Sequence, residues 1–447
     1  MIILGIETSC DETAIALIES ADGRNIRVLA DKTLSQIELH KQYGGVFPNM
    51  AKREHSRNLV PLLKVVLEEG FGNPKSQISN HKQTPREQTV NLEKIFEKER
   101  DLLKQFLEVI PTIGKPQIDA IAVTEGPGLE PCLWTGINLA KALSLVWNIP
   151  VIPVNHMEGH IFSALLRAEE STKSQAPNSK QTTNSKLKST NKKTTHYSLH
   201  TAHFPALALL ISGGHTELVL IKGLGNYEII GQTRDDAVGE AFDKVARLLG
   251  LPYPGGPQIS ALAEEARTLA DNTQNDAEKI RLPRPMLHSK DFDFSFSGLK
   301  TAVLYLLKKL SEQDGVTPVS DSPREVRVSR RLQSLIAREF ENAVTEVLVA
   351  KTKAAIEQYG AKTLLIGGGV IANTHIRRAF EDLENSDGRR DLLNGLALYI
   401  PEPELTTDNA LMIAVAGAIR FAKGGVSPQT ASFRAQGNLR LAQNTDL

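Results

Sequence analysis

The strongest constraint on the fold is a strand–turn–strand pattern that occurs twice in this chain of 447 residues. In the first copy, apolar residues 2–6 and 14–18 flank a turn of small and acidic residues. In the second copy, residues 206–211 and 217–221 flank the turn 212–216. Two strands joined by a short polar turn form a β-hairpin. The repeat therefore predicts two halves that each begin with a hairpin.

Between and after the hairpins, apolar strands alternate with helical segments. Residues 118–123 and 151–154 read as strands on either side of a helix over 133–147, and residues 363–366 read as a strand that runs into three glycines and a helix. Such alternation predicts an α/β fold with partly parallel sheets. Glycines between a strand and a helix also place backbone amides where an anionic group can bind.

Charge and cysteine content exclude several classes of protein. The formal net charge is zero, so RNA would have to be bound by a local patch or with help from another protein. Two cysteines are too few for a disulfide framework or a CxxC zinc site. No stretch reaches the roughly 18 apolar residues of a membrane span, and we expect no leader before the first strand. We expect a cytoplasmic protein that does not enter a membrane.

Two polar regions interrupt the pattern and are expected to be insertions. Residues 73–110 combine a polar loop with an amphipathic helix over 92–110. Residues 168–203 are rich in Ser, Thr, Asn and Lys and are expected to form a flexible linker. A helix over 51–69 opens with basic residues that suit either an RNA-facing patch or an ordinary solvated face.

The pair His156 and His160 is the clearest candidate for a metal site. Residues four apart lie on one face of a helix, so both imidazoles can reach one ion. Glu158 lies roughly 200° around the helix from His156 and should point away, unlike the general base of an HExxH protease. The pair alone suits core or capping histidines equally well. Asp408 reads either as a helix N-cap or as a third ligand.

Taken in order, these motifs resemble the universal tRNA threonylcarbamoyladenosine synthase family, called TsaD in bacteria and formerly labelled O-sialoglycoprotein endopeptidase. The resemblance extends from the first residue to about residue 421, with only the polar insertions unmatched. It rests on residues 5–13, 43–46, 156–160, 212–216, 239–244, 253–257, 294–301, 367–370 with Asn373, and 407–410.

The resemblance implies a fold, a metal and a donor substrate. The fold is that of the actin-like ATPase superfamily: two lobes of duplicated ribonuclease H-like structure around a central cleft. One lobe would comprise residues 1–155 completed by about 405–447, and the other residues 156–404. One divalent metal would be held by His156, His160 and Asp408, with Fe2+ expected and Zn2+ or Mg2+ as alternatives. Threonylcarbamoyl-AMP would be bound by Leu210, Ile211, Ser212, Gly213, Gly214, Asp243, Gly256 and Asn373.

The resemblance also implies the reaction and its partners. The threonylcarbamoyl group would pass to the exocyclic N6 amine of the adenosine 3′ of the anticodon, in tRNAs that read codons beginning with A. Asp11 and Glu12 are the candidates for a catalytic base. Expected partners are tRNA, a TsaB-like paralogue, a TsaE-like small ATPase and an upstream threonylcarbamoyl-AMP synthase.

Three alternatives compete with this interpretation. The histidine pair and the old family label favour a metalloprotease, but the expected position of Glu158 argues against it. A kinase or ATPase of the actin-like superfamily shares the fold and has no need of a His-His-Asp site. A non-catalytic paralogue would have lost these motifs, whereas this chain retains them.

Overall fold

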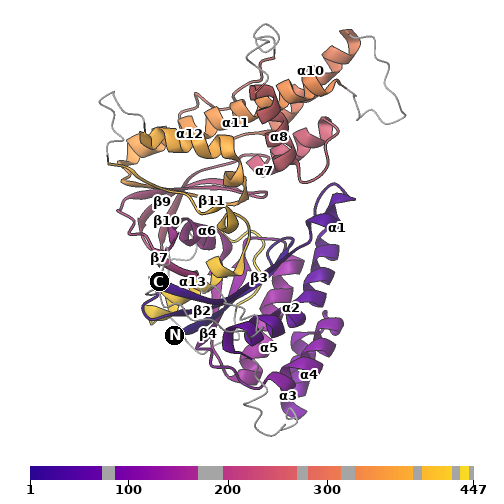
Figure 1. The fold of residues 1–447 in the computed structure, drawn as a ribbon, viewed down its shortest axis with the longest axis vertical. Coiled ribbons are helices and arrows are strands. Elements are labelled where there is room, and N and C mark those ends of the chain that lie inside the picture. Colours follow the sequence, from indigo (N-terminus) through magenta and orange to yellow (C-terminus); the bar gives the residue numbers. More distant parts are fainter. Residues whose placement is uncertain are drawn as a thin grey trace, which may run out of the picture.

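The chain folds around two mixed β-sheets (Figure 1). The computed structural model describes residues 1–72, 86–169, 195–268, 280–313, 328–385, 395–424 and 433–441. In spatial order, the first sheet contains β5 (Val151–Asn155), β4 (Ala120–Gly126), β1 (Ile2–Glu7), β2 (Glu12–Ser20), β3 (Asn25–Ser35), β7 (Thr195–Leu199) and β6 (Leu166–Ala168). The second contains β10 (Asn226–Gln232), β9 (Thr216–Gly223), β8 (Ala206–Ile211), β11 (Thr363–Gly367) and β12 (Ala397–Tyr399).

The two sheets share one topology. In the first, β1 pairs antiparallel with β2 and parallel with β4, while β3 and β5 continue the sheet on either side. In the second, β8 pairs antiparallel with β9 and parallel with β11, while β10 and β12 continue it in the same way. The predicted α/β class and the duplication of its hairpin-first half are therefore confirmed.

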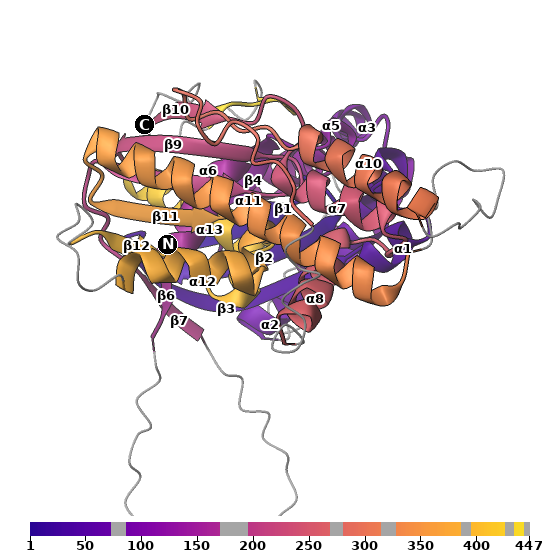
Figure 2. The same cartoon turned by 90° about the horizontal axis from the view of Figure 1, so that it is seen from above.

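Helices cover the outer faces of both sheets, and two helices fill the space between them (Figures 1 and 2). The first sheet is covered by helices α2 and α5, with α4 packed on α2, and the second by α7, α8, α10 and α11. Helices α6 and α13 share one apolar core with the facing sides of both sheets. The helical bounds are α1 (Ile37–Lys41), α2 (Pro48–Phe71), α3 (Arg86–Ile95), α4 (Arg100–Ile113), α5 (Glu130–Trp147), α6 (His156–Leu165), α7 (Val238–Leu248), α8 (Gly255–Thr268), α10 (Ser297–Gln313), α11 (Arg330–Tyr359), α12 (Thr374–Asn385) and α13 (Ala410–Ala422).

Close packing fixes the central helices against the first sheet. A Cβ on Gly5 of β1 would lie 2.4 Å from the Ala410 carbonyl oxygen at the start of α13. A Cβ on Gly417 would lie 2.4 Å from the Ala122 side chain of β4. Both contacts are too short for any side chain, so glycine lets helix and sheet approach. The segment just before α13 is thereby placed beside the hairpin turn that follows β1.

The single helix predicted over 92–110 is wrong, because the chain turns between α3 and α4. Glu99 in this turn is buried and forms an ion pair with Lys52 of α2, at 2.6 Å. The Glu99 carboxylate also accepts a hydrogen bond from the Asn138 amide of α5, at 2.9 Å. A continuous helix would give up these contacts with α2 and α5. Residues 73–85 of the predicted insertion lie outside the described residues.

The linker predicted over 168–203 is wrong at its C-terminal end. Thr195–Leu199 forms strand β7, which pairs antiparallel with β3 and with β6 and so extends the first sheet. The open edge of β3 supplies backbone hydrogen-bonding groups that a polar segment can satisfy. Residues 170–194 lie outside the described residues. The lobe boundaries expected near residues 155 and 405 remain predictions. Among the described helices, none combines the length and the apolar character that a membrane crossing requires.

Candidate functional site

The two histidines and Asp408 meet at the junction of the central helices. His156 opens α6, whose N-terminus is capped by the Asn155 side chain, which accepts hydrogen bonds from the Met157 and Glu158 amides. The Nε2 atoms of His156 and His160 each lie 3.3 Å from Asp408 Oδ1. One ligand atom from each of the three residues lies within 4.8 Å of the others. The three residues predicted to share one metal are thus brought together.

Asp408 does not cap α13, so the capping alternative is wrong. The cap is Asn409, whose side-chain oxygen accepts a hydrogen bond of 2.9 Å from the Met412 amide. Asn409 has an extended backbone, as expected of a capping residue. Asp408, one residue earlier, directs its carboxylate towards the histidines instead. The sequence could not distinguish these roles because both residue types make good caps.

The electrostatics of the cluster suit a divalent cation. Burial would raise the pKa of Asp408, but His156 holds that pKa well below its usual range. Burial lowers the pKa of His160 and so favours its neutral form, which is the form that binds metals. Within the described residues, the buried Nδ1 of His160 makes no hydrogen bond, and its Nε2 lies 3.3 Å from Asp408 Oδ1. A buried ring nitrogen beside an ionised carboxylate fits a metal ligand.

Glu7 is a functional candidate that sequence reasoning missed. It ends β1, is completely buried and accepts a 3.0 Å hydrogen bond from His156 Nδ1. It also accepts a 2.6 Å hydrogen bond from the Thr124 hydroxyl and one from the Ser9 amide. Burial would raise the pKa of Glu7, but His156 holds it below its ordinary value. The available signal was a carboxylate directly after a buried strand, at the start of an acidic turn.

Glu158 points away from the cluster, as its position on the helix predicts. Its carboxylate accepts a 2.8 Å hydrogen bond from the Tyr227 hydroxyl of β10 and pairs with Arg420 of α13 at 2.5 Å. Arg420 also donates to the Pro153 carbonyl, at 2.6 Å. The Glu158 carboxylate is thus fully engaged away from the histidines. It is not placed to activate a water on a bound metal, which argues against a metalloprotease.

The acidic turn between β1 and β2 carries Asp11 and Glu12. Burial raises the pKa of Asp11 and raises that of Glu12 well above its usual range, and the neighbouring Asp11 carboxylate raises the pKa of Glu12 further. The negative charge of Asp408 raises the pKa of both carboxyls as well. The same turn reaches the candidate metal site through Ser9, whose hydroxyl lies 3.4 Å from Asp408 Oδ2.

The second hairpin turn offers bare backbone to a ligand. A Cβ on Gly213 or Gly214 would meet nothing within 4 Å, so their backbones face open space. The Gly239 amide at the start of α7 donates to the Ser212 carbonyl, at 3.2 Å. Leu210 and Ile211 end β8 with fully buried side chains, so only their backbone could face a ligand. This geometry suits an anionic ligand held by amides.

Helix α7 and the loop before α8 carry the next group of residues predicted to bind the donor. The Asp243 carboxylate accepts a 2.7 Å hydrogen bond from the Gly255 amide, which fixes the glycine pair that opens α8. A Cβ on Gly256 would meet nothing within 4 Å. Burial raises the pKa of Asp243, and the negative charge of Asp11 raises it further. Asp11 of the first half is therefore close enough to Asp243 of the second half for their negative charges to repel each other.

Asn373 is held rigidly in front of α12. Its side-chain oxygen accepts hydrogen bonds from the His375 and Ile376 amides, at 2.9 and 3.0 Å. Its side-chain nitrogen donates to Glu341, at 2.5 Å. Glu341 is fully buried on α11 and forms an ion pair of 2.6 Å with Arg267 of α8. Only the second N–H of the Asn373 amide remains available to a ligand.

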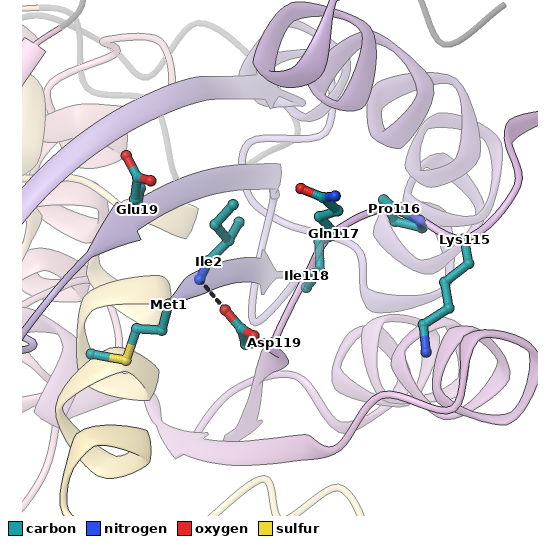
Figure 3. Close-up of a pocket in the computed structure, with 8 residues that line it drawn as sticks. All are labelled: Met1, Ile2, Glu19, Lys115, Pro116, Gln117, Ile118 and Asp119. Carbon is teal, nitrogen blue, oxygen red and sulfur yellow. Dashed lines mark hydrogen bonds between the residues drawn. The ribbon is translucent and has the colours of Figure 1, made fainter. Parts of the chain in front are cut away.

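A surface pocket of about 620 Å³ lies elsewhere, near the N-terminus (Figure 3). It is lined by Met1, Ile2, Glu19 and the loop before β4. The Ile2 amide donates to the Asp119 carboxylate there, at 2.6 Å. None of the predicted site residues lines this pocket.

Comparison with known proteins identifies the family of this chain. The family model described as TsaD, tRNA N6-adenosine threonylcarbamoyltransferase, matches residues 27–75, 101–179 and 190–415. A protein of that name from Aromatoleum aromaticum is 39% identical over 434 residues, which is 97% of this chain and 95% of the relative. Another from Burkholderia thailandensis is 39% identical over 423 residues, 95% of this chain and 93% of the relative.

Two solved structures are also similar. A ROK family glucokinase from Streptomyces griseus, in complex with glucose and AMPPNP, has a TM-score of 0.36 at 11% identity. The match covers 95% of this chain and 100% of the glucokinase. Full-length HypF in its phosphate- and nucleotide-bound form has a TM-score of 0.35 at 13% identity, over 73% of this chain and 42% of HypF. The match of the family model, together with relatives 39% identical over nearly their whole length, shows that the chain belongs to the tRNA N6-adenosine threonylcarbamoyltransferase family.

Proposed function

We propose that this chain transfers the threonylcarbamoyl group of threonylcarbamoyl-AMP to the N6 amine of the adenosine 3′ of the anticodon. The substrates would be tRNAs that read codons beginning with A. The observation that carries the proposal is the His156–His160–Asp408 cluster, which adjoins the turn of the first hairpin. The membership of the family supports the same reaction.

We propose that the cluster binds one divalent metal, with Fe2+ expected and Zn2+ or Mg2+ as alternatives. Two imidazoles and one carboxylate leave coordination positions open for a substrate. A cation bound there would supply Lewis-acid chemistry and a template for the oxygens of the donor. His160 is suited to the role because its ring is buried and its Nε2 lies 3.3 Å from the Asp408 carboxylate.

The second half of the chain would hold the adenylate. The open amides of Gly213 and Gly214 would donate to its phosphate, since backbone N–H groups stabilise charge there without reorganisation. Asp243 would shape the loop around Gly256 through its bond to the Gly255 amide. The remaining N–H of Asn373 would donate to an acceptor on the ribose or the base. Leu210 and Ile211 would contribute backbone groups only, whereas Ser212 would contribute its backbone or its short side chain.

The acceptor amine must lose a proton when its nitrogen attacks the carbamoyl carbon and AMP leaves. Adenylate is a good leaving group, so positioning and charge stabilisation suffice and no protein nucleophile is required. We assign the proton to Asp11, which lies in the acidic turn beside the candidate metal site and whose pKa is raised by burial. A carboxylate whose pKa is raised towards neutrality is a better general base than an ordinary one.

We propose further that the protein works in the cytoplasm, where its tRNA substrates are found, and together with other proteins. A net charge of zero gives no global attraction for tRNA, which is consistent with binding as part of an assembly. A TsaB-like paralogue and a TsaE-like small ATPase are the proposed partners. A threonylcarbamoyl-AMP synthase would supply the donor.

The test is a reconstituted reaction containing unmodified tRNA with an ANN-reading anticodon, threonine, bicarbonate, ATP, the donor synthase and the partner proteins. Mass spectrometry of digested nucleosides measures threonylcarbamoyladenosine. We expect product with the wild type and none with His156→Ala. Tyr227→Phe, which alters the far side of α6, is the matched control and should retain product. Steady ATP hydrolysis by the chain alone, without modified nucleoside, would replace the transferase with a superfamily ATPase.

A further inference from the structure

Glu7 contacts His156 at Nδ1, the ring nitrogen that faces away from Asp408, and nothing in the proposed reaction uses Glu7 directly. We propose that Glu7 is a positioning residue that selects the metal-binding tautomer of His156 and ties the metal site to the acidic turn. This inference rests on the proposed metal site. It concerns a residue that contacts the candidate ligand and not the metal itself.

The first step is the chemistry of the three groups around the Glu7 carboxylate. The Ser9 amide can only donate a hydrogen bond, and it donates to Oε1. The Thr124 hydroxyl and His156 Nδ1 both lie against Oε2, at 2.6 and 3.0 Å. An ionised carboxylate only accepts hydrogen bonds, so all three neighbours must direct hydrogens towards it. The arrangement therefore places the proton of a neutral His156 on Nδ1.

The second step is the consequence for the other ring nitrogen. A neutral imidazole with its proton on Nδ1 has a lone pair on Nε2. His156 Nε2 is the atom that lies 3.3 Å from Asp408 and faces the cluster. The carboxylate thus presents the ligand atom to the site and fixes the ring plane. Such carboxylate–histidine–metal arrangements raise the basicity of the ligand and tighten metal binding.

The third step links the site to the candidate catalytic turn. Ser9 is held at its amide by Glu7 and approaches Asp408 with its hydroxyl, at 3.4 Å. The Ser9 carbonyl also accepts a hydrogen bond from the Leu129 amide at the start of α5, at 2.7 Å. Two candidate ligands, His156 and Asp408, therefore contact the turn that carries the acidic pair. Occupation of the site should order this turn.

Glu7→Gln tests the assignment with little change of shape. A carboxamide must place its NH2 group either against the Ser9 N–H or against His156 Nδ1. The first arrangement opposes two donors. The second stabilises the tautomer with its proton on Nε2, which cannot bind a metal through that nitrogen. Loss of such a partner typically weakens metal binding by 10- to 100-fold. We expect a loss of this size for Glu7→Gln.

The measurement is a titration of the full-length apo protein with Co2+, followed by visible absorption, and competition with Zn2+. Thr124→Val and Tyr227→Phe form a matched pair, because each removes one hydroxyl hydrogen bond to a buried glutamate next to α6. Thr124→Val should weaken binding severalfold, and Tyr227→Phe should stay within twofold of wild type. Circular dichroism establishes that each variant is folded. If Glu7→Gln does not fold, the matched pair decides.

Hydrogen exchange provides a readout of the link to the turn. Zn2+ should slow exchange of the amides of residues 8–12 in the wild type and less so in Glu7→Gln. Equal metal affinity of folded Glu7→Gln and wild type would overturn the inference, as would equal weakening by Tyr227→Phe and Thr124→Val. Absence of Co2+ and Zn2+ binding by the wild type would also overturn it. Normal titrations without transferase activity would instead contradict the proposed function alone.

Discussion

The contact between Glu158 and Arg420 predicts a large and specific loss of stability. Only 1% of the Glu158 side chain and 13% of the Arg420 side chain are exposed. Glu158→Leu leaves the guanidinium buried without its carboxylate, which costs about 3–5 kcal/mol. It also removes the acceptor of the Tyr227 hydroxyl, for which a further cost of about 1 kcal/mol or more applies. We expect a total of about 4–6 kcal/mol, a large part of the typical 5–15 kcal/mol of a native protein.

The double variant Glu158→Leu/Arg420→Met separates charge from packing. Replacing both members of a buried ion pair by apolar groups is often close to neutral. We therefore expect the double variant to recover most of the loss that Glu158→Leu causes, so that the losses of the two single variants are strongly non-additive. Urea unfolding followed by circular dichroism and by fluorescence measures the free energies, and coincident transitions justify a two-state treatment. A loss below about 1 kcal/mol for Glu158→Leu, or strictly additive losses, would refute this account of the contact.

Three further predictions concern Gly368, Glu341 and His55. Gly368→Ala should destabilise the protein and abolish the nucleotide binding that calorimetry measures. The reason is that Gly368 has a φ of +95° and a Cβ there would lie 2.4 Å from the Ile211 carbonyl oxygen. Gly213→Ala should fold normally, because a Cβ on Gly213 would meet open space. Glu341→Gln should raise the KM for the donor more than it lowers kcat, because it weakens the hydrogen bond that orients the Asn373 side-chain amide. A kcat and a KM unchanged from the wild type would contradict this role. Burial lowers the pKa of His55 to about 4, below its ordinary 6.5, so between pH 6.5 and 4 the unfolded chain takes up a proton that the folded chain does not. As the pH falls through this window, the free energy of unfolding should decrease by up to about 1.4 kcal/mol per pH unit. Urea unfolding of His55→Gln should show a flatter pH dependence than that of the wild type.

Much of the fold could be predicted because periodicity and turn chemistry are local. The hairpins and the strands β4, β5 and β11 follow from apolar runs bounded by glycine or polar residues. The break between α3 and α4 could not be predicted, because it depends on tertiary contacts of Glu99 with Lys52 and Asn138. Likewise, β7 becomes a strand only because the edge of β3 lies open beside it.

The candidate site was predictable in part for the same reason. The spacing of His156 and His160 is a local signal, whereas Asp408 joins them only through the packing of α13 on the first sheet. Glu7 carries no spacing signal, since its partners Thr124 and His156 lie more than 100 residues away. The basic opening of α2 is explained by packing in part: Lys52 pairs with Glu99, and His55 is buried with its Nδ1 2.7 Å from the Thr13 hydroxyl, whereas Arg53 and Arg57 are exposed.

A single-turnover reaction tests the central claim most directly. Purified protein loaded with Fe2+ or Zn2+ is mixed in excess, together with the proposed partner proteins, with threonylcarbamoyl-AMP and unmodified tRNA that reads an ANN codon. The nucleosides are quantified by mass spectrometry. The account predicts threonylcarbamoyladenosine at the position 3′ of the anticodon with the wild type, and loss of the product with His160→Ala and with Asp408→Ala. Undiminished product from both folded variants would contradict the role of the cluster, and absence of product from the wild type would contradict the transferase.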